Sequence, residues 1–453
     1  MSVDGFACFL TALDTIRPAF TYPGFNNLVV VFVGWVLTSG PHAVTQALVA
    51  TGVPGRRHHE AFHRFFSRGT WLPDRVGHLL FDKVAAKLVP RDSAIRAVVD
   101  DTLAIKKGAD VFGIGSHLDP VRSTKAFRVF AFGHVWVVLA VIVSVPFSHR
   151  PWALPILFRL YRNKKECAKK GARYRKKTEL AREIVNILAS WAPDRRIEVA
   201  ADSAYCNATV LKKLPKHVVF FGDMRPDAVL TAAPPRRSKD GRGRRPVRGR
   251  VLPKPSMLAA DQRRPWLKCE VKLYGKRRTI HFKTLDAQWY RACGAQLVRI
   301  VVVRVDTGKV KLRVFFCTET GPKPLEILQT YARRWSIEVC FRDLKQQLGF
   351  SDSSARKKEA VERTAPFVGF IYTSLVLWFS EGIWQTQIAA PPLRPWYRHK
   401  QGLCFADVVR AAQRVFIHID VLDPERTYDN LRELEPSLRS HPSPRVPARK
   451  RAA

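Results

Sequence analysis

The chain has 453 residues, of which 46% are hydrophobic, and it carries 77 Lys and Arg residues against 38 Asp and Glu residues. This length predicts roughly two to four domains, and the hydrophobic share excludes a wholly disordered chain. The net charge of +39 favours a polyanion as partner through counterion release. The eight cysteines include no CxxC pair, which argues against zinc ligands and disulfides and is typical of a reducing cytosol.

The first 93 residues are predicted to form a helical N-terminal region that binds DNA. Within it, His59 and His63 satisfy the HExxH pattern of zinc metalloproteases. No third ligand follows at a recognisable spacing, and the flanking arginines would repel a dication. We therefore expect a helix whose Phe62, Phe65 and Phe66 pack inward while its Arg and His side chains contact DNA phosphates.

Two short apolar runs predict buried strands that lead into acidic residues. Ile95 to Val99 is followed by Asp100 and Asp101, and Ile197 to Ala201 is followed by Asp202. Acids in these positions lie at the rim of a sheet. For any one such Asp taken alone, a turn or a helix cap is the alternative interpretation.

The apolar stretch 129–147 is long enough to cross a bilayer, but it is rich in β-branched residues and includes Gly133 and His134. We expect two buried strands joined at 132–134, and no membrane span. The following stretch 163–191 predicts a basic helix with a core stripe at helical spacing. That stripe consists of Ile184, Ile187 and Leu188.

A basic segment, 234–256, is rich in Pro, Gly and Arg and lacks any apolar period, so we expect it to be mobile without a ligand. Arg242, Arg244 and Arg245 are candidate DNA contacts, either as a hook in the minor groove or as part of a disordered basic loop. After this segment, alternation and β-branching predict strands. These strands lie in 266–285, 295–306 and 309–319, with a hairpin turn at 306–308.

Tyr331, Arg334, Glu338 and Lys345 form one spaced set, Y-x2-R-x3-E-x6-K. On a helix their side chains fall within an arc of roughly 60°. A carboxylate is thus flanked by two cations and a phenol, which suits a metal ion and a phosphate backbone. A solvated charged helix face is the alternative. Further on, we expect a buried helix in 366–384, an amphipathic helix in 405–416 and a basic disordered tail in 441–453.

The spaced set resembles the Tyr-Arg-Glu-Lys signature of bacterial insertion-sequence transposases of the DDE type. The resemblance covers most of 55–380 and includes the tripeptide DDT at 100–102 and the stretch ADSAY at 201–205. It implies an α/β ribonuclease-H-like core, a mixed sheet flanked by helices, interrupted by a β-rich insertion and preceded by a helical N-terminal domain. The expected divisions are the DNA-binding region 1–93, the first part of the core 94–215, the insertion with its basic hinge 216–325, the second part of the core 326–390, and the C-terminal helical segment and tail 391–453.

The resemblance implies that Asp101, Asp202 and Glu338 are the catalytic residues and hold two Mg²⁺ or Mn²⁺ ions, which prefer oxygen ligands. Asp101 is preferred because the residue directly before Thr102 aligns with the family's first acid. Asp100 remains the alternative, since adjacent strand residues face opposite ways and both flanks are apolar.

By the same resemblance, Tyr331, Arg334 and Lys345 position the DNA end. The implied activity is cleavage at the ends of an insertion sequence and joining of the freed 3′-OH to target DNA by two-metal phosphoryl transfer. Double-stranded DNA is the expected partner, a homodimer on DNA the expected assembly, and the bacterial cytoplasm, close to the nucleoid, the expected location. The alternatives are a ribonuclease-H-like nuclease or a domesticated DNA-binding protein without transposition activity.

Overall fold

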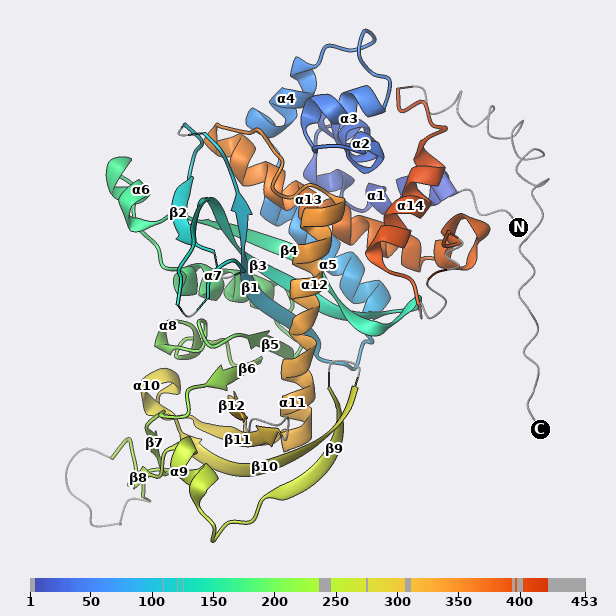
Figure 1. The fold of residues 1–453 in the computed structure, drawn as a ribbon. Helices are drawn as coiled ribbons and strands as arrows, with labels where there is room; N and C mark the ends of the chain where they lie inside the picture. Colours follow the sequence, from blue (N-terminus) through green and yellow to red (C-terminus); the bar gives the residue numbers. More distant parts are fainter. Residues whose placement is uncertain are drawn as a thin grey trace, which may run out of the picture.

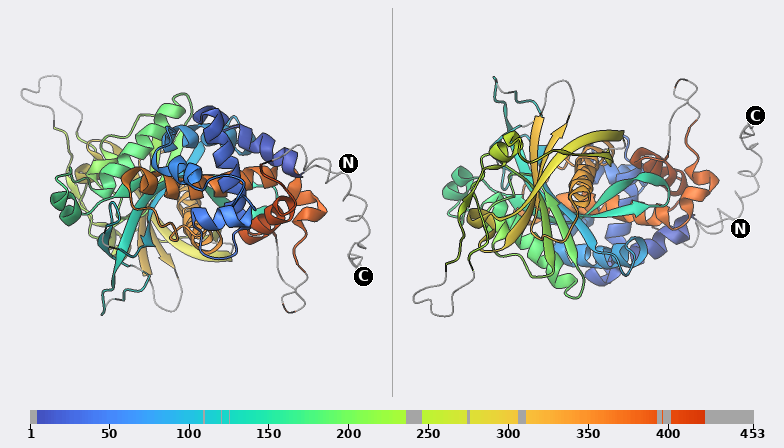
Figure 2. Two further views of the ribbon diagram at one scale, coloured as in Figure 1. Left: turned by 90° about the horizontal axis from the view of Figure 1, so that it is seen from above. Right: turned by 90° about the horizontal axis from the view of Figure 1, so that it is seen from below.

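The computed structural model describes residues 5–108, 110–119, 121–124, 126–235, 246–273, 276–305, 311–392, 396 and 402–422. Within these residues one mixed sheet of twelve strands runs through the molecule, and helices pack against it (Figure 1). Figure 2 shows the N-terminal helices gathered with the last helices of the chain, away from the later strands of the sheet. The fold is therefore a mixed sheet flanked by helices.

Five strands form the part of the sheet that carries the predicted acids. In spatial order they are β4 (Ser148–Tyr161), β3 (Phe130–Val145), β1 (Ile95–Ile105), β5 (Ile197–Ala201) and β6 (Val218–Met224). β3 is antiparallel to both β1 and β4, whereas β5 is parallel to both β1 and β6. The two predicted strands near the acids are thus confirmed, and they lie side by side. β1 extends to Ile105, so its acids lie within the strand instead of at its end.

The sheet continues from β6 through the later, β-rich part of the chain. Its further strands are β12 (Lys311–Cys317), β11 (Leu297–Val305), β10 (Lys276–Gln288), β9 (Leu267–Leu273), β7 (Leu230–Thr231) and β8 (Val251–Leu252), with β2 (Gly115–Leu118) at the far edge beside β3. The strands predicted in 266–285, 295–306 and 309–319 are confirmed as β9 to β12, while the predicted turn at 306–308 lies outside the described residues. β6 falls within the stretch 216–325 but is parallel to β5, so it extends the first group of strands.

The prediction of two strands joined at 132–134 is wrong, because β3 is one continuous strand of 16 residues. Gly133 pairs with Ile105 of β1 and with Gly115 of β2. A Cβ atom at Gly133 would lie 2.2 Å from the carbonyl oxygen of Ala104, so this glycine permits a close approach of two backbones and makes no turn. The turn comes later, at 146–147, since Val145 already pairs with Ser148 of β4.

The N-terminal region is helical, as predicted. Its helices are α1 (Gly5–Asp14), α2 (Tyr22–Leu37), α3 (Val44–Ala50), α4 (Glu60–Ser67) and α5 (Pro73–Leu88), with a 3-10 turn at Arg17–Ala19. Phe62, Phe65 and Phe66 of α4 are buried, which confirms that the aromatic side of the HExxH helix faces the core. Within the described part of the chain, none of the helices combines the length and the apolar character that a membrane span requires.

The remaining helices surround the strands. They are α6 (Lys164–Lys169), α7 (Lys177–Trp191), α8 (Ala208–Leu211), α9 (Pro255–Ala260), α10 (Tyr290–Cys293), α11 (Pro324–Arg333), α12 (Trp335–Gln347), α13 (Lys358–Ser380) and α14 (Phe405–Phe416), with 3-10 turns at Ile383–Gln385 and Gln387–Ala389. The basic stretch 163–191 forms two helices instead of the one predicted. The buried and amphipathic helices predicted in 366–384 and 405–416 are confirmed as the second half of α13 and as α14, and the tail 441–453 lies outside the described residues.

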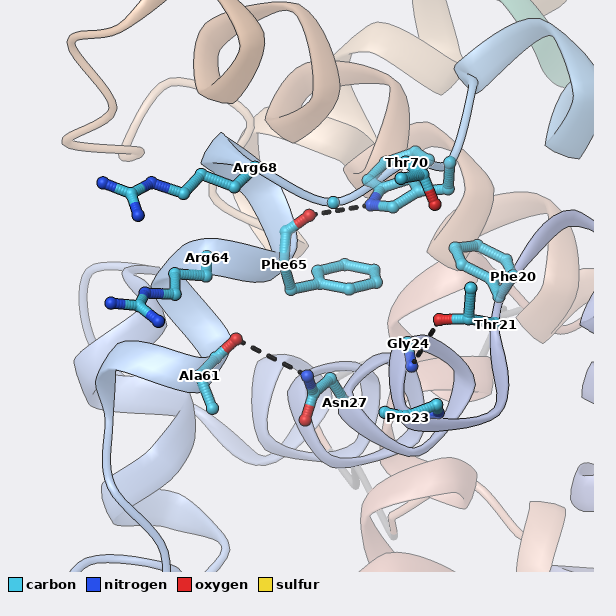
Figure 3. A pocket seen from close by; sticks show the side chains of 12 residues that line it. Phe20, Thr21, Pro23, Gly24, Asn27, Ala61, Arg64, Phe65, Arg68 and Thr70 are labelled. Atoms are coloured by element: carbon cyan, nitrogen blue, oxygen red, sulfur yellow. Dashed lines mark hydrogen bonds between the residues drawn. The ribbon is translucent and has the colours of Figure 1, made fainter.

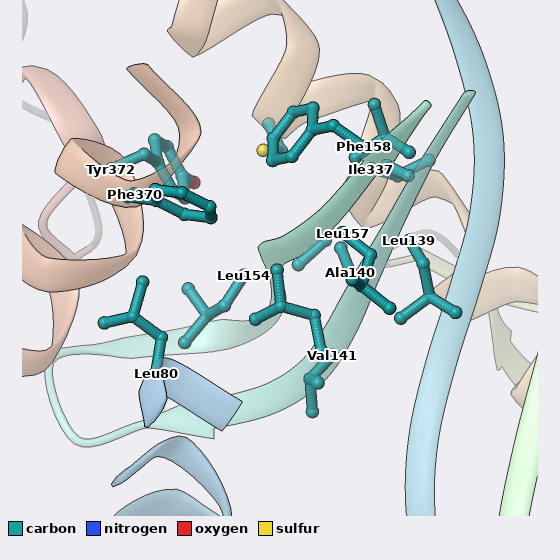
Figure 4. Close-up of a cluster of buried hydrophobic side chains, with 14 of the residues drawn as sticks. Leu80, Leu139, Ala140, Val141, Leu154, Leu157, Phe158, Ile337, Phe370 and Tyr372 are labelled. Atoms are coloured by element: carbon teal, nitrogen blue, oxygen red, sulfur yellow. The ribbon is translucent and has the colours of Figure 1, made fainter. Parts of the chain in front are cut away.

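The main core packs α12 and α13 onto the β3–β4 hairpin. Figure 4 shows Ile337 of α12 and Phe370 of α13 directed toward Leu139, Leu154 and their neighbours on the hairpin. From Ala360 to Phe379, α13 is buried almost all round, which explains its nearly uninterrupted apolar sequence. This packing fixes α12 against the sheet and so sets the position of the residues that α12 carries.

Candidate active site

Adjacent acids of β1 point to opposite faces of the sheet. Asp100 receives a hydrogen bond from Arg334, which lies between α11 and α12, whereas Asp101 receives one from Lys177 at the start of α7. This is the alternation that a pleated strand imposes on successive side chains. Two faces can therefore be distinguished, an acidic face that includes Asp100 and a lysine face that includes Asp101.

Parallel pairing places two further acids beside Asp100. Val99 of β1 lies next to Ala201 of β5, so the following residues, Asp100 and Asp202, are neighbours on the acidic face. Ala200 of β5 lies next to Phe221 of β6, and a step of two residues along both strands brings Asp223 beside Asp202. Asp223 was missed by the sequence analysis, although it also follows an apolar run, Val218 to Phe221.

Arg334 connects Asp100 to Glu338. Its Nη1 donates to Oδ2 of Asp100 at 2.8 Å, and its Nη2 donates to Oε1 of Glu338 at 3.0 Å. One guanidinium therefore spans a carboxylate of the sheet and a carboxylate of α12. The Arg334 backbone is held by N–H donation to the carbonyl of Tyr331 at 3.0 Å, at the break between α11 and α12. The predicted single helix is thus two helices with Arg334 at the junction.

On the acidic face, the surroundings of Asp100 disfavour its ionised form. Burial raises the pKa of Asp100 to about 7, and the neighbouring charges of Asp202 and Asp101 act in the same direction, while Arg334 opposes them. Burial also raises the pKa of Asp223, again with a contribution from Asp202. Arg334 opposes the shift at Asp100 and the ion-paired Arg313 opposes the shift at Asp223, and a further cation between these carboxylates would likewise stabilise their ionised forms. Within the described residues, no three acid, imidazole or thiol groups converge as a ready metal cluster, and Arg334 lies between Asp100 and Glu338.

Asp101 has structural partners on the lysine face. Lys177 Nζ donates to one carboxylate oxygen at 2.7 Å, and the hydroxyl of Tyr205 donates to the other at 2.6 Å. Tyr205 is buried and lies three residues after Asp202, so Asp101 ties the end of β5 to α7. Burial and the Lys177 charge lower the pKa of nearby His117 to about 4, which keeps that imidazole neutral. Both oxygens of Asp101 thus accept hydrogen bonds, as do both oxygens of Asp100, which accept from Arg334 and from the N–H of Asp101.

A family model described as DDE superfamily endonuclease matches residues 22–292, which is more than half of the chain. The chain belongs to the DDE endonuclease superfamily. The matched stretch contains Asp100, Asp101, Asp202 and Asp223 of this endonuclease. A second model, described as the archaeal putative transposase ISC1217, matches residues 267–378, which include Glu338. Together the two matches support a transposase and a DDE nuclease fold.

No curated protein matches the endonuclease. Among solved structures, the cryo-EM structure of a piggyBac transposase synaptic complex with hairpin DNA is similar, with 9% sequence identity and a TM-score of 0.45. That alignment covers 99% of this chain and 87% of the other. A likeness of this size carries no argument about the site.

Two members of the spaced set take different positions in the endonuclease. Tyr331 is buried, its ring lies 4.8 Å from that of Phe315, and burial raises its pKa to about 12. The Arg334 guanidinium lies over this ring, 5.6 Å from its centroid, so Tyr331 packs against Arg334. Lys345 is exposed and lies at a polar cavity of about 460 Å³ between α12 and the loop 38–42. The four residues therefore do not share one exposed face.

The three candidate arginines of the basic segment, Arg242, Arg244 and Arg245, lie outside the described residues, so their DNA contact stays a prediction. The segment's flanks do pair, which the sequence analysis did not expect. Leu230 lies opposite Leu252, and the N–H of Ala232 donates to the carbonyl of Arg250.

A separate cavity of about 230 Å³ lies in the helical N-terminal region (Figure 3). Phe20, Phe65 and Trp71 form its aromatic side, and the indole of Trp71 donates to the carbonyl of Phe65 at 2.9 Å. Arg64 and Arg68 extend along its edge. The cavity contains no acidic residue, so it is not part of the candidate active site.

Proposed function

We propose that this DDE endonuclease is a DNA transposase that cuts the ends of an insertion sequence and joins the freed 3′-OH to target DNA. The observation that carries the proposal is the bridge of Arg334 between Asp100 and Glu338, on the face that also presents Asp202. Two carboxylates, one from a strand and one from a later helix, thereby bond to one cation, and Asp202 of the neighbouring parallel strand lies beside Asp100. This is the residue chemistry that phosphoryl transfer on DNA requires.

We further propose that the core is ribonuclease-H-like. The spatial order β4-β3-β1-β5-β6, with β3 alone antiparallel to both of its neighbours, supports this assignment. The acids then come from the two central parallel strands and from α12. The stretch from β7 to β12 is in this scheme an insertion that prolongs the same sheet.

For the first acid we propose Asp100 in place of Asp101. The sequence resemblance preferred Asp101, but Asp101 lies on the lysine face, where it bonds to Lys177 and Tyr205 and has no other acid of the set beside it. Asp100 lies on the acidic face, next to Asp202 and one guanidinium away from Glu338. Asp101 then acts as a structural residue that anchors β5.

The donor set of the acidic face fits hard divalent cations, since carboxylate oxygens are the preferred ligands of Mg²⁺ and Mn²⁺. Asp100, Asp202 and Glu338 would hold these ions, and a bound cation would favour the ionised form of Asp100, whose pKa burial raises. When bound, two such ions supply activation of the attacking oxygen and stabilisation of the leaving oxygen.

The protein's own side chains perform the remaining tasks. Arg334 orients Glu338 and presents positive charge to a phosphate at the acidic face, and the exposed Lys345 contacts the DNA backbone farther along α12. The net charge of +39 supports double-stranded DNA as the partner. We extend the proposal to a homodimer on paired DNA ends, acting in the bacterial cytoplasm close to the nucleoid.

Substitution of Glu338 by Gln tests this function. With Mg²⁺ or Mn²⁺ and a supercoiled plasmid that carries the gene and its flanking DNA, cleavage should fall roughly 10²- to 10³-fold. DNA affinity should stay nearly unchanged, because Lys and Arg provide the phosphate contacts. Glu359→Gln, an equal change at an exposed residue of α13, is the control and should cleave like the parent. Equal cleavage by Glu338→Gln and the parent would exclude Glu338 from the site.

A further inference from the structure

An apolar, aromatic surface is exposed on the ribbon formed by β2 and the start of β3. Phe130 and Phe132 are 62% and 64% exposed, and Leu118 is 46% exposed. Leu118 lies directly opposite Phe130 in the antiparallel ladder, so the three side chains share one face of the ribbon. We call these three residues the aromatic ribbon. Exposed aromatic groups that cluster in this way mark interaction surfaces.

The aromatic ribbon lies on the same face of the sheet as Asp100. Asp100 is opposite Val138, and every second residue of β3 from there points to that face, ending at Phe132 and Phe130. The N–H of Lys106 donates to the carbonyl of Phe132, so Phe132 lies six residues along β1 from Asp100. This corresponds to about 20 Å along the strand. The residues of that face in between, Trp136 and His134, are buried beside Phe350, Ser353 and Ala355, so the aromatic ribbon is a separate exposed surface.

In the described parts of the connection between β2 and β3, polar side chains bond to the backbone. The Asp119 carboxylate accepts from the N–H groups of Val121 and Arg122 at 3.0 and 3.2 Å, and the Asp119 N–H donates to the carbonyl of Val129 at 2.8 Å. The Ser123 hydroxyl accepts from the N–H of Val129 at 3.0 Å. These bonds tie the described residues on either side of the ribbon's end to one another.

The charge around the aromatic ribbon matches DNA. Arg122 and Arg128 are exposed cations on the same connection, and the whole chain carries a net charge of +39. A second copy of this chain would bring the same positive charge to the contact. A duplex supplies phosphates for the arginines and bases for the rings, since Phe side chains insert between base steps and stack on unpaired bases.

We propose that the aromatic ribbon contacts DNA bases at an unstacked step of the bound duplex. This inference rests on the proposed function, because it takes DNA as the bound partner. The arginines hold the backbone, and the rings of Phe130 and Phe132 replace the base stacking that the distorted duplex has lost. DNA that is already unpaired is therefore the preferred ligand of this surface.

The test compares binding to two duplexes of the same composition, one fully paired and one with a central mismatched bubble. The parent should bind the bubble at least about fivefold more tightly, and the double variant Phe130→Ala and Phe132→Ala should lose that preference. Its affinity for the paired duplex should remain. Tyr22→Ala, which removes an aromatic side chain that is 70% exposed on α2, is the matched control and should keep the preference.

Unchanged bubble preference in the double variant would overturn the proposal. Loss of a dimer by that variant, in sedimentation without DNA, would overturn it as well, because the surface would then join two copies of this chain. Plasmid cleavage by the parent is measured in parallel. If the parent does not cleave the plasmid but its bubble preference depends on Phe130 and Phe132, the proposed function is wrong and the proposed base contact is still supported.

Discussion

Asp100 and Asp101 are neighbouring aspartates of one strand, but the acidic face and the lysine face give their side chains different surroundings. Asp100 is buried among other carboxylates, and its pKa is raised to about 7. Asp101 is matched to a lysine and a buried tyrosine that use both of its oxygens. The comparison shows that residue type and position in a motif do not define a site. Both oxygens of Asp100 also accept hydrogen bonds, from Arg334 and from the N–H of Asp101, so the two aspartates differ in their neighbours. Asp100 lies beside Asp202 and one guanidinium away from Glu338, whereas Asp101 faces Lys177 and Tyr205.

The largest effect apart from loss of an acid is expected on removal of the bridging cation. Arg334→Gln should reduce plasmid cleavage by roughly 10²-fold, because Glu338 loses the partner that orients it and the phosphate loses a charge-assisted hydrogen bond. Arg334→Lys should recover only part of this activity, since one ammonium cannot span two carboxylates as a guanidinium does.

Arg333→Gln is the matched control for the bridging arginine. It makes the same change one residue earlier, on a side chain that does not bridge Asp100 and Glu338. Single-turnover cleavage of the plasmid compares the three variants. Equal activity of the Arg334→Gln and Arg333→Gln variants would show that the bridge has no part in the reaction.

The lysine face should affect stability more than cleavage. Tyr205→Phe removes a hydrogen bond of 2.6 Å to a carboxylate from a buried side chain. We expect the free energy of unfolding to fall by about 2 kcal/mol, because hydrogen bonds to charged groups contribute more than neutral ones. Denaturant titration at neutral pH measures the change. Tyr174→Phe, which loses a longer bond of 3.3 Å to Tyr161, should cost less.

Full stability with lost cleavage in the Tyr205→Phe variant would contradict this division of roles. In that case Asp101 and Tyr205 would belong to the reaction, and the face assignment would have to be reversed.

A smaller effect concerns pH. The pKa of Asp100 is raised from its ordinary value of 3.8 to about 7 in the folded protein, so between these values the native state holds a proton that the unfolded chain has released. This contribution to stability is present at low pH and is lost as the pH rises through 7. Asp100→Asn should therefore raise the Tm relative to the parent more at pH 8 than at pH 5, with divalent ions removed.

Adding Mg²⁺ at pH 8 should raise the Tm of the parent and leave the Asp100→Asn variant nearly unchanged, because binding to the native state alone is stabilising. Asp101→Asn is the control and should still respond to Mg²⁺. If the Tm of the parent and that of the Asp100→Asn variant change with pH in the same way, the pKa of Asp100 is not raised in the folded protein.

Much of the fold follows from local pattern. The strands leading to Asp100 and Asp202, the strands β9 to β12 and the helix α14 have periodicities or apolar runs that were sufficient for prediction. Gly133 was misassigned because the reason for that glycine is a carbonyl of another strand, which no local pattern reveals. The break at Arg334 was missed for a related reason, since the arginine turns toward an acid 234 residues earlier in the chain.

The site was predictable in its residue types but only partly in its geometry. Spacing identified Arg334 and Glu338, and the apolar runs identified the aspartates. The choice between Asp100 and Asp101 depends on the register of β1 against β5 and on which helix covers each face, and both are long-range properties. Asp223 could have been found from the apolar run before it, yet its place beside Asp202 comes from parallel pairing with β5.

The most direct test of the account is a comparison of Asp100→Asn with Asp101→Asn in metal-dependent plasmid cleavage. Both variants remove one negative charge and keep nearly the same shape. The account predicts that Asp100→Asn loses roughly 10²- to 10³-fold in rate while DNA affinity is unchanged. Asp101→Asn should retain most of the rate and lose stability instead. Loss of cleavage by Asp101→Asn, with activity retained by Asp100→Asn, would contradict the assignment of the acidic face as the place of reaction.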